Sequence, residues 1–341
     1  MAKMEDVLKG LAEKYKPNVE EDEYISSGSI IFDAVLSKGK GIPKKKFIQI
    51  SSDSGVGKTT LVLHASRVAC SKGLRVIYLD VEKGVNEDQL KGIGLLKYLN
   101  DKFFLFPIST FEEAEEVLDK ILDDEDLAYV VIDSITALIP SKTIEKSIAE
   151  VEPGLNARYA SAFLAKYKAI LERSKSKASF IFINQMRNKL NFMRGSTYEA
   201  AGGSAQKFYM DIRIMMVRTE KLEKTIMTLE GKKSVPYGAN VKVWAEKNRH
   251  NRPFLEGIMT VLFGKGISNI AAYQRVLMQK GVLTMAGAGF YTLTLPGKEP
   301  LKSRGSAGVS DCIKKNLAEI KAYVDSVGGI NLIEDDGGGD D

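Results

Sequence analysis

The sequence has few of the residues that mark secreted, zinc-binding or membrane proteins. Its two cysteines, Cys70 and Cys312, lie far apart and form no CxxC pair, which argues against disulfides and against a zinc site. No apolar run approaches the roughly 20 residues of a membrane-spanning helix. The N-terminal MAKMEDVLKGLAEKYK is a charged amphipathic helix rather than a signal peptide. We therefore expect a cytoplasmic protein with reduced thiols and no membrane partner.

Charge of either sign is in no large excess. The net charge of +5 over 341 residues is mild, so composition alone does not establish nucleic-acid binding. A hydrophobic content of 44% is enough for one large core and a smaller satellite domain. The C-terminal IEDDGGGDD has five carboxylates and no cation, and it predicts a disordered acidic tail that serves either solubility or regulation.

What is present is a series of short apolar strands separated by helical segments. We expect strands at FIQIS, RVIYLD, YVVID, SFIFIN, DIRIMMV, NVKVWA and GIMTVLF, several of them apolar throughout, as buried parallel strands are. FEEAEEVLDKILDD and LNARYASAFLAKYKAILERSK have helical periodicity. The alternation predicts an α/β fold with a mostly parallel central sheet, helices on both faces and ligands beyond the carboxyl ends of the strands.

The chain changes character near residue 267. NIAAYQRVLMQKGVLTMAGAGFYTLT predicts a helix, a turn and a small hairpin, and SDCIKKNLAEIKAYVDSV predicts one final helix. We therefore expect an N-terminal helix and linker at 1–29, a core at 30–266, a small α/β C-terminal domain at 267–330 and the acidic tail at 331–341.

The stretch QISSDSGVGKTTLVLHAS lies where a buried strand passes into a helix. Backbone N–H groups and the positive end of the helix dipole converge there, which favours a bound phosphate. Gly55 and Gly57 allow the backbone to wrap closely, Lys58 supplies a positive charge, and the Thr59 hydroxyl suits a magnesium ion. The predicted nucleotide-binding run is Asp53, Ser54, Gly55, Val56, Gly57, Lys58, Thr59 and Thr60. Ser52 stands where the consensus has a glycine, so we expect Ser52 to adopt a backbone geometry that glycine adopts more readily.

Carboxylates follow two of the apolar strands. Asp133 ends YVVID, and beside a phosphate loop its expected role is to hold magnesium. Asp80 and Glu82 follow the strand RVIYLD two residues apart, on the same side of the pleat. Because hydrolysis needs a group that orients or deprotonates the attacking water, Glu82 is the candidate base.

A long basic loop follows a third strand. Asn184 and Gln185 stand at the end of that strand, in position to meet a terminal phosphate. In the loop after them, Arg187, Lys189 and Arg194 alternate with apolar side chains. Cations that meet phosphates and apolar side chains that wedge between bases are typical of single-strand binding.

Several of these stretches, in this order and at nearly this spacing, resemble bacterial RecA recombinases and their phage relatives. They are ISSGSIIFDAVLSKGKGIPKKKFIQISSDSGVGKTTL, YLDVEKGVN, YVVIDSITALIP, PGLNARYAS, FIFINQMRNKL and GGSAQKFYMDIR, and the resemblance covers essentially the whole chain. It implies a RecA-like P-loop ATPase that uses ATP and Mg²⁺, polymerises on single-stranded DNA into a helical filament, and exchanges strands with a homologous duplex in recombination and repair. Single-strand-binding and loader proteins are further implied partners.

The resemblance also implies roles for single residues. Lys58 and Thr59 are similar to the phosphate and magnesium ligands, Asp133 to the carboxylate behind the metal, Glu82 to the catalytic glutamate and Gln185 to the sensor of the γ-phosphate. The implied nucleotide site extends to Asn86. The DNA contacts implied by the two loops are Gly154, Arg158 and Ser161 from the first, and Arg187, Asn188, Lys189, Leu190, Gly202, Gly203 and Ser204 from the second.

The segment EKNRHNRPF resembles the part of the family that reaches across a subunit interface. This places Lys247 and Arg249 at the neighbour's ATP, similar to an arginine finger supplied in trans. The chain's own phosphate site already has a cation, Lys58, so Lys247 and Arg249 have no obvious partner there. Three departures from the family, Gln89 for a stacking tyrosine, Pro153 for methionine and Arg194 for an aromatic residue, leave base selectivity and the DNA contacts open and favour a divergent, phage-type member.

Two other interpretations share parts of the pattern. A hexameric RecA-fold helicase or another ring ATPase would have the same phosphate loop and strand-end aspartate, but the second loop with GGSAQKFY and the N-terminal helix favour a filament. A scaffold that binds ATP without hydrolysing it would need neither Glu82 nor Gln185.

Overall fold

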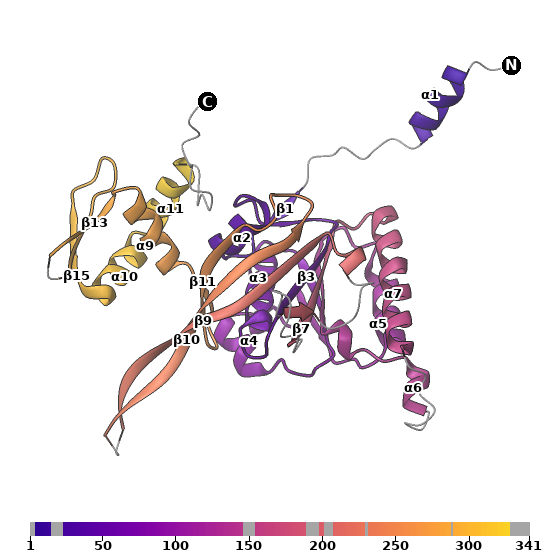
Figure 1. Ribbon diagram of the computed structural model, residues 1–341, viewed down its shortest axis with the longest axis horizontal. Coiled ribbons are helices and arrows are strands. Elements are labelled where there is room, and N and C mark those ends of the chain that lie inside the picture. The colour runs from indigo at the N-terminus through magenta and orange to yellow at the C-terminus, as the bar shows by residue number, and fades with distance from the viewer. Residues whose placement is uncertain are drawn as a thin grey trace, which may run out of the picture.

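The computed structural model describes residues 4–14, 23–145, 154–188, 198–200, 207–228, 231–287 and 289–327. Within these ranges the centre is a ten-stranded sheet with the order β12-β11-β10-β9-β3-β7-β6-β4-β5, and β8 pairs with β7 outside this path (Figure 1). Its strands are β3 (Phe47–Ser52), β4 (Arg75–Asp80), β5 (Phe103–Phe106), β6 (Leu127–Asp133), β7 (Ser179–Asn188), β8 (Tyr198–Ala200), β9 (Ile212–Thr228), β10 (Gly231–Asn248), β11 (Glu256–Leu262) and β12 (Gly266–Ser268).

The strands from β9 to β5 run parallel to one another, whereas β10, β11 and β12 continue the sheet antiparallel. All seven expected strands are confirmed, and with them the mostly parallel sheet. The sequence analysis missed β5, a four-residue edge strand of which three residues are only partly buried. It also missed the distal halves of β9 and β10, which lack the apolar alternation of a packed strand.

Helices cover both faces of the parallel strands (Figure 1). On one face α2 (Ile30–Ser37), α3 (Lys58–Ser71) and α4 (Glu87–Ile93) share a buried cluster with residues such as Ile50 and Leu61. On the other face α5 (Phe111–Ile121) and α7 (Leu155–Arg173) share a second cluster, in which Phe163 and Tyr167 meet Phe180 and Phe182 of β7. The remaining elements of this part are α1 (Met4–Lys14), β1 (Tyr24–Ile25), β2 (Ile42–Pro43), η1 (Leu96–Tyr98), η2 (Ile135–Ala137) and α6 (Ser141–Glu145).

The elements after β12 lie to one side of the large sheet and have a buried cluster of their own (Figure 1). They are α9 (Ile270–Gln279), the three-stranded sheet β13 (Leu283–Ala286), β14 (Phe290–Leu293) and β15 (Leu301–Arg304), and the helices α10 (Gly305–Lys315) and α11 (Leu317–Ser326). The prediction of one final helix was wrong. The helix is interrupted at Asn316, whose φ of −110° and ψ of 22° lie outside the helical range. Its side-chain amide and its backbone N–H both donate to the Cys312 carbonyl, at 2.8 and 3.2 Å.

The predicted acidic tail lies outside the described residues. Among the helices that the structure does describe, none combines the length and the apolar character needed to span a bilayer.

A buried histidine fixes α3 against the antiparallel end of the sheet. His64 is 7% exposed, and its Nδ1 accepts a hydrogen bond from the Ile267 backbone N–H at 3.3 Å. Two glycines leave room for the ring: a Cβ at Gly266 would lie 2.4 Å from Nδ1, and one at Gly28 would lie 2.8 Å from Nε2. Burial, helped by the positive charge of Arg67, lowers the pKa of His64 to about 4.

We predict that His64→Gln reduces the loss of stability in acid. Because the folded-state pKa of about 4 lies below the usual 6.5, the neutral ring contributes fully above pH 6.5, and this stability is lost as the pH falls toward 4, by about 3 kcal/mol in all. Denaturant unfolding at pH 7 and at about pH 4.5 measures the difference. His250→Gln, a change in the chain's other histidine, is the comparison variant. Identical pH dependence in His64→Gln and the wild type would contradict the assignment.

Candidate functional site

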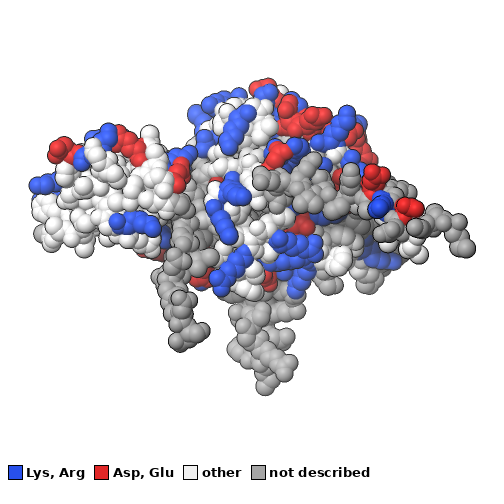
Figure 2. All heavy atoms as spheres, turned by 90° about the horizontal axis from the view of Figure 1, so that it is seen from above, with Lys and Arg blue, Asp and Glu red and all other residues white. Residues whose placement is uncertain are grey.

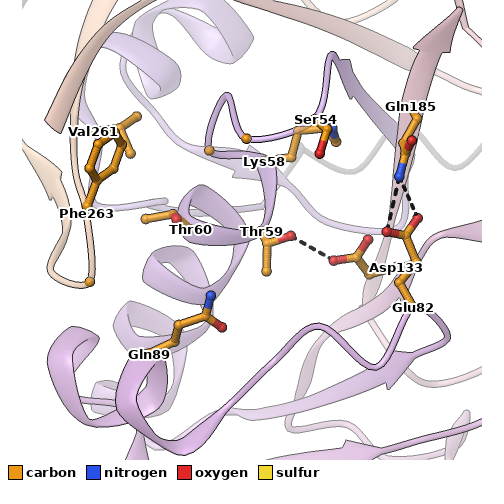
Figure 3. A pocket seen from close by; sticks show the side chains of 13 residues that line it. Ser54, Lys58, Thr59, Thr60, Glu82, Gln89, Asp133, Gln185, Val261 and Phe263 are labelled. Atoms are coloured by element: carbon orange, nitrogen blue, oxygen red, sulfur yellow. Dashed lines mark hydrogen bonds between the residues drawn. The ribbon is translucent and has the colours of Figure 1, made fainter. Parts of the chain in front are cut away.

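A cavity of about 330 Å³ lies at the carboxyl edge of the parallel strands (Figure 3). Side chains reach it from the loop after β3, from α3 and α4, from the ends of β4, β6 and β7, and from the β11–β12 turn. Its lining is Ser54, Gly55, Gly57, Lys58, Thr59, Thr60, Glu82, Gln89, Asp133, Gln185, Val261, Phe263 and Gly264.

The loop between β3 and α3 turns at its glycines. Gly55 and Gly57 have φ of 71° and 114°, in the left-handed region that glycine adopts without strain. Gly57 is also the N-cap of α3 and has no side chain that could accept from the first N–H groups of the helix. This arrangement suits an anion at the helix N-terminus.

The Lys58 ammonium is held inside the loop. It donates to the carbonyl and hydroxyl oxygens of Ser52 at 3.0 and 3.1 Å and to the Asp53 carbonyl at 3.0 Å. Burial lowers the pKa of Lys58, while the nearby Asp133 and Glu82 carboxylates oppose that shift. The expectation for Ser52 was wrong: it is the last residue of β3, and left-handed geometry begins only at Gly55.

A hydroxyl and a carboxylate meet at the floor of the cavity. The Thr59 hydroxyl donates to Asp133 Oδ2 at 2.9 Å, and the fully buried Tyr78 hydroxyl donates to the same oxygen at 2.7 Å. Burial raises the pKa of Asp133, and these two hydrogen bonds oppose the rise. Because hard divalent cations prefer oxygen ligands, this pair is suited to hold Mg²⁺ directly or through water.

Glu82 and Gln185 form a hydrogen-bonded pair beside the metal-type ligands (Figure 3). Gln185 Nε2 lies 3.1 and 3.2 Å from the two Glu82 carboxylate oxygens, and the Ser134 hydroxyl donates to Glu82 Oε1 at 2.7 Å. Asp80 has another task, because its carboxylate accepts the backbone N–H groups of Gly84 and Val85, both at 3.1 Å. Of the two predicted carboxylates, only Glu82 lines the cavity.

Some predicted nucleotide residues have local structural tasks. Asn86 is the N-cap of α4 and accepts from the Gln89 N–H at 2.9 Å, and it is Gln89 that lines the cavity. Val56 is buried in the core. Asn184 accepts a hydrogen bond from Thr136 Oγ1 at 3.3 Å and is fully buried. The described lining therefore omits Asn86, Val56, Asn184 and also Asp53, whose carbonyl binds Lys58.

The sequence analysis missed the wall formed by Val261, Phe263 and Gly264. Val261 and Phe263 lie across the cavity from Asp133 and Gln185 (Figure 3). The turn approaches α4 closely, since a Cβ at Gly92 would lie 1.8 Å from the Gly264 carbonyl oxygen. A local signal exists, a large aromatic followed by glycine at a strand end, and Phe263 is indeed 43% exposed.

The predicted DNA-binding residues are only partly described. Gly154 is the N-cap of α7 with φ of 78°, Arg158 is exposed on the first turn and Ser161 is partly exposed. The backbone of Arg187 and Asn188 ends β7, in register with β8. Lys189, Leu190, Gly202, Gly203 and Ser204 lie outside the described residues, as do Pro153 and Arg194.

Lys247 and Arg249 lie at the amino edge of the sheet, away from the chain's own cavity. Lys247 Nζ donates to the carbonyls of Lys207 and Met210 at 3.1 and 2.6 Å, and Arg249 lies 3.6 Å from the Asp211 carboxylate. Burial and the charge of Arg249 lower the pKa of Lys247. Figure 2 views the molecule from this edge, and Lys and Arg side chains gather over the middle of the visible face.

The family described as RecA N-terminal domain matches residues 5–268. The chain belongs to the RecA family. It is 32% identical over 299 residues to protein RecA of Thermotoga neapolitana, covering 87% of this chain and 81% of that protein. It is 34% identical over 268 residues to protein RecA of a Nocardioides species, covering 79% of this chain and 73% of that protein. The crystal structure of the RadB recombinase shares the fold, with a TM-score of 0.50 and 21% identity over 71% of this chain and 98% of that one.

Membership in the RecA family makes the chain a recombination and repair protein and a DNA-dependent ATPase. The helicase alternative is not favoured, because these relatives are RecA proteins. We therefore expect the nucleotide of this RecA-family chain to bind in the cavity.

We predict that Tyr78→Phe lowers the free energy of unfolding by about 1–3 kcal/mol, because the buried Asp133 carboxylate loses one of its two side-chain donors. Urea denaturation at neutral pH measures the loss. Tyr129→Phe is the matched control: this tyrosine is equally buried, but its hydroxyl contacts only the Ile25 carbonyl at a long 3.4 Å among the described residues. Equal losses in the two variants would show that the Tyr78–Asp133 hydrogen bond has no special weight.

Proposed function

We propose that the cavity binds ATP with Mg²⁺ and that hydrolysis there drives the chain's work on DNA. The observation that carries the proposal is convergence: Lys58, the Thr59–Asp133 pair and the Glu82–Gln185 pair come from four separate segments and line one cavity. Phosphate, metal and attacking water each find a suitable group within it.

Lys58 and the N-terminus of α3 bind the phosphates. The ammonium now bonded to Ser52 and Asp53 exchanges those oxygens for phosphate oxygens of the nucleotide. Thr59 and Asp133 would hold Mg²⁺, which would neutralise part of the phosphate charge. The adenine base of the nucleotide lies against Val261 and Phe263. Phe263 can stack on adenine, which the amide side chain of Gln89 cannot do in the same way.

Glu82 orients the attacking water and accepts its proton. Its carboxylate lies in the cavity and is already held by Ser134 and Gln185, so little reorganisation is needed. Gln185 has one amide group to share between Glu82 and a terminal phosphate. It stands on β7, whose end leads into the proposed second DNA loop, so it links the state of the nucleotide to that of the loop.

We predict that Glu82→Gln lowers ATP turnover by about 10²- to 10⁴-fold, because it removes the group that accepts the proton of the attacking water. Binding of a fluorescent ATP analogue should change little, because Glu82 acts on the water rather than on the nucleotide. Glu87→Gln, in the exposed first turn of α4, is the control and should hydrolyse ATP normally. Undiminished turnover in Glu82→Gln would remove Glu82 from the reaction.

We propose that the protein binds single-stranded DNA. The second DNA partner is a homologous duplex, which supplies the strand that is exchanged. The N-terminus of α7, with Gly154, Arg158 and Ser161, lies toward the carboxyl edge because the helix runs antiparallel to the strands it precedes. The end of β7, from Met186 to Asn188, lies at the same edge, paired with β8. We further propose the division 1–29, 30–266, 267–330 and 331–341, assembly into a helical filament, and single-strand-binding and loader proteins as partners in a cytoplasmic setting.

The position of Lys247 and Arg249 supports a site shared between protomers. Both stand at the opposite edge of the sheet from the chain's own cavity and near the carboxylate of Asp211. In a head-to-tail assembly, one protomer's amino edge meets the next protomer's carboxyl edge. There the two cations reach the neighbour's γ-phosphate, as in an arginine finger supplied in trans.

We predict that the double variant Lys247→Ala, Arg249→Ala binds ATP as a protomer but loses most of its DNA-stimulated turnover, because the neighbour's γ-phosphate loses both cations. Mixing provides the decisive measurement. Lys58→Ala protomers have a defective site of their own but still offer both cations, so adding them should partly restore the double variant's turnover. If the two proteins co-assemble and no activity returns, the cations do not act in trans.

A further inference from the structure

The residues just before β9 contact both of the cations that are proposed to act in trans. Lys247 Nζ donates to the carbonyls of Lys207 and Met210. The next residue in the chain, Asp211, lies with its Oδ1 3.6 Å from Nη1 of Arg249. Lys247 is therefore held by backbone carbonyls, whereas Arg249 lies against a carboxylate.

The Asp211 carboxylate is itself held firmly. The residue is 5% exposed, and its Oδ2 accepts the Phe47 backbone N–H at 2.9 Å and a hydrogen bond from the Lys168 ammonium on α7. The Asp211 backbone N–H donates in turn to the Phe47 carbonyl at 2.9 Å. Because Phe47 is the first residue of β3, these bonds fix the carboxylate against the central sheet.

Positive charge gathers around this carboxylate. Lys168 and Arg249 both pair with it. Burial and the charge of Arg249 lower the pKa of Lys247, Lys168 contributes further, and Asp211 opposes them. Without the carboxylate, the three cations would repel one another across the amino edge.

We propose that Asp211 is a positioning residue that holds the Arg249 guanidinium where it meets the neighbour's γ-phosphate. The Arg249 side chain is 58% exposed, so without a partner it would sample many rotamers. A cation that is already held does not have to lose this freedom when the two protomers meet. The inference rests on the proposed function, because it requires Lys247 and Arg249 to act in trans.

A purely structural role explains only half of the carboxylate. The contacts to Phe47 and Lys168 both use Oδ2 and tie α7 to the start of β3. They leave the placement of Oδ1 beside Arg249 without a purpose. The positioning role accounts for both oxygens, since one is anchored and the other holds the cation.

The test variant is Asp211→Asn, which keeps the side-chain shape and an acceptor for the Phe47 N–H but removes the charge. Asp124→Asn is the matched control. Asp124 is another partly buried carboxylate at the amino edge, paired with Arg75 at the start of β4. DNA-stimulated ATP turnover of the full chain is measured across ATP concentrations, and urea denaturation reports the stability that each variant has lost.

Asp211→Asn should lower kcat about tenfold, because the neighbour's γ-phosphate loses a well-placed cation. The KM for ATP should change little, since each protomer keeps its own cavity intact. Asp124→Asn should hydrolyse ATP at the wild-type rate.

A double-mutant cycle separates positioning from stability. In the Arg249→Ala background, Asp211→Asn should cause no further loss of turnover, because the group that it positions is absent. Combining Lys168→Met with Asp211→Asn removes both charges of the buried pair, so no unpaired ammonium remains. This combination should show the same low turnover, and it takes the place of Asp211→Asn if that variant does not fold.

Three results would overturn the inference. Undiminished turnover in Asp211→Asn, or a further loss on top of Arg249→Ala, would exclude positioning through Arg249. Normal turnover in the combination with Lys168→Met would reduce the effect to an unpaired ammonium. Faster turnover in Asp211→Asn would show that the carboxylate withholds Arg249 from the neighbour.

Failure of the proposed function would look different. If the double variant Lys247→Ala, Arg249→Ala keeps normal turnover, the shared site itself is wrong and the inference falls with it. If that double variant loses turnover while Asp211→Asn does not, the shared site stands and only the role of Asp211 is refuted.

Discussion

The hydrogen bonds from the Gln185 amide to the Glu82 carboxylate join β7 to the segment after β4 at the carboxyl edge of the sheet, where hydrolysis is proposed to take place. A hydrogen bond to a charged group contributes about 1.5–3 kcal/mol when buried and less in this exposed position. Its value is positional. The register of β6 pairs Asp133 with Asp80 of β4 and with Ile183 of β7, so Glu82 and Gln185, each two residues further along, meet just beyond Asp133. The rest of the site follows from that register.

The cavity holds charges whose burial is not fully compensated by the protein. Burial lowers the pKa of Lys58 and raises that of Asp133, so each environment disfavours the charged form of its residue. A polyphosphate beside Lys58 and a divalent cation beside Asp133 reverse both effects. The side chains of the cavity are therefore arranged to bind a metal–nucleotide complex, because folding has already placed the charges that such a complex would neutralise.

Local patterns carried most of what the sequence could predict. The apolar strands, the glycines of the predicted phosphate loop and the strand-end carboxylates are each encoded within about ten residues. The strands are confirmed in the fold, and Gly55, Gly57, Glu82 and Asp133 line one cavity. Ser52 was misjudged because the consensus does not say where the backbone turns, and in this chain the turn begins at Gly55. The last helix is interrupted at Asn316, although periodicity alone would continue it.

Contacts between distant segments could not be predicted in the same way. Phe263 reaches the cavity only because β11 continues the sheet beyond β10, a pairing that no short pattern specifies. The distal halves of β9 and β10 could not be predicted from the sequence, because they face no core and therefore lack apolar alternation. The roles of the DNA loops remain predictions, since most of their residues lie outside the described ranges.

The central claim is that Gln185 couples the nucleotide site to the DNA loop that follows β7. The most direct test is the ratio of ATP turnover with single-stranded DNA to turnover without it, in the wild type and in Gln185→Ala. The account predicts a large ratio in the wild type and a ratio near one in the variant, with binding of the ATP analogue retained. Equal stimulation of both proteins would contradict it.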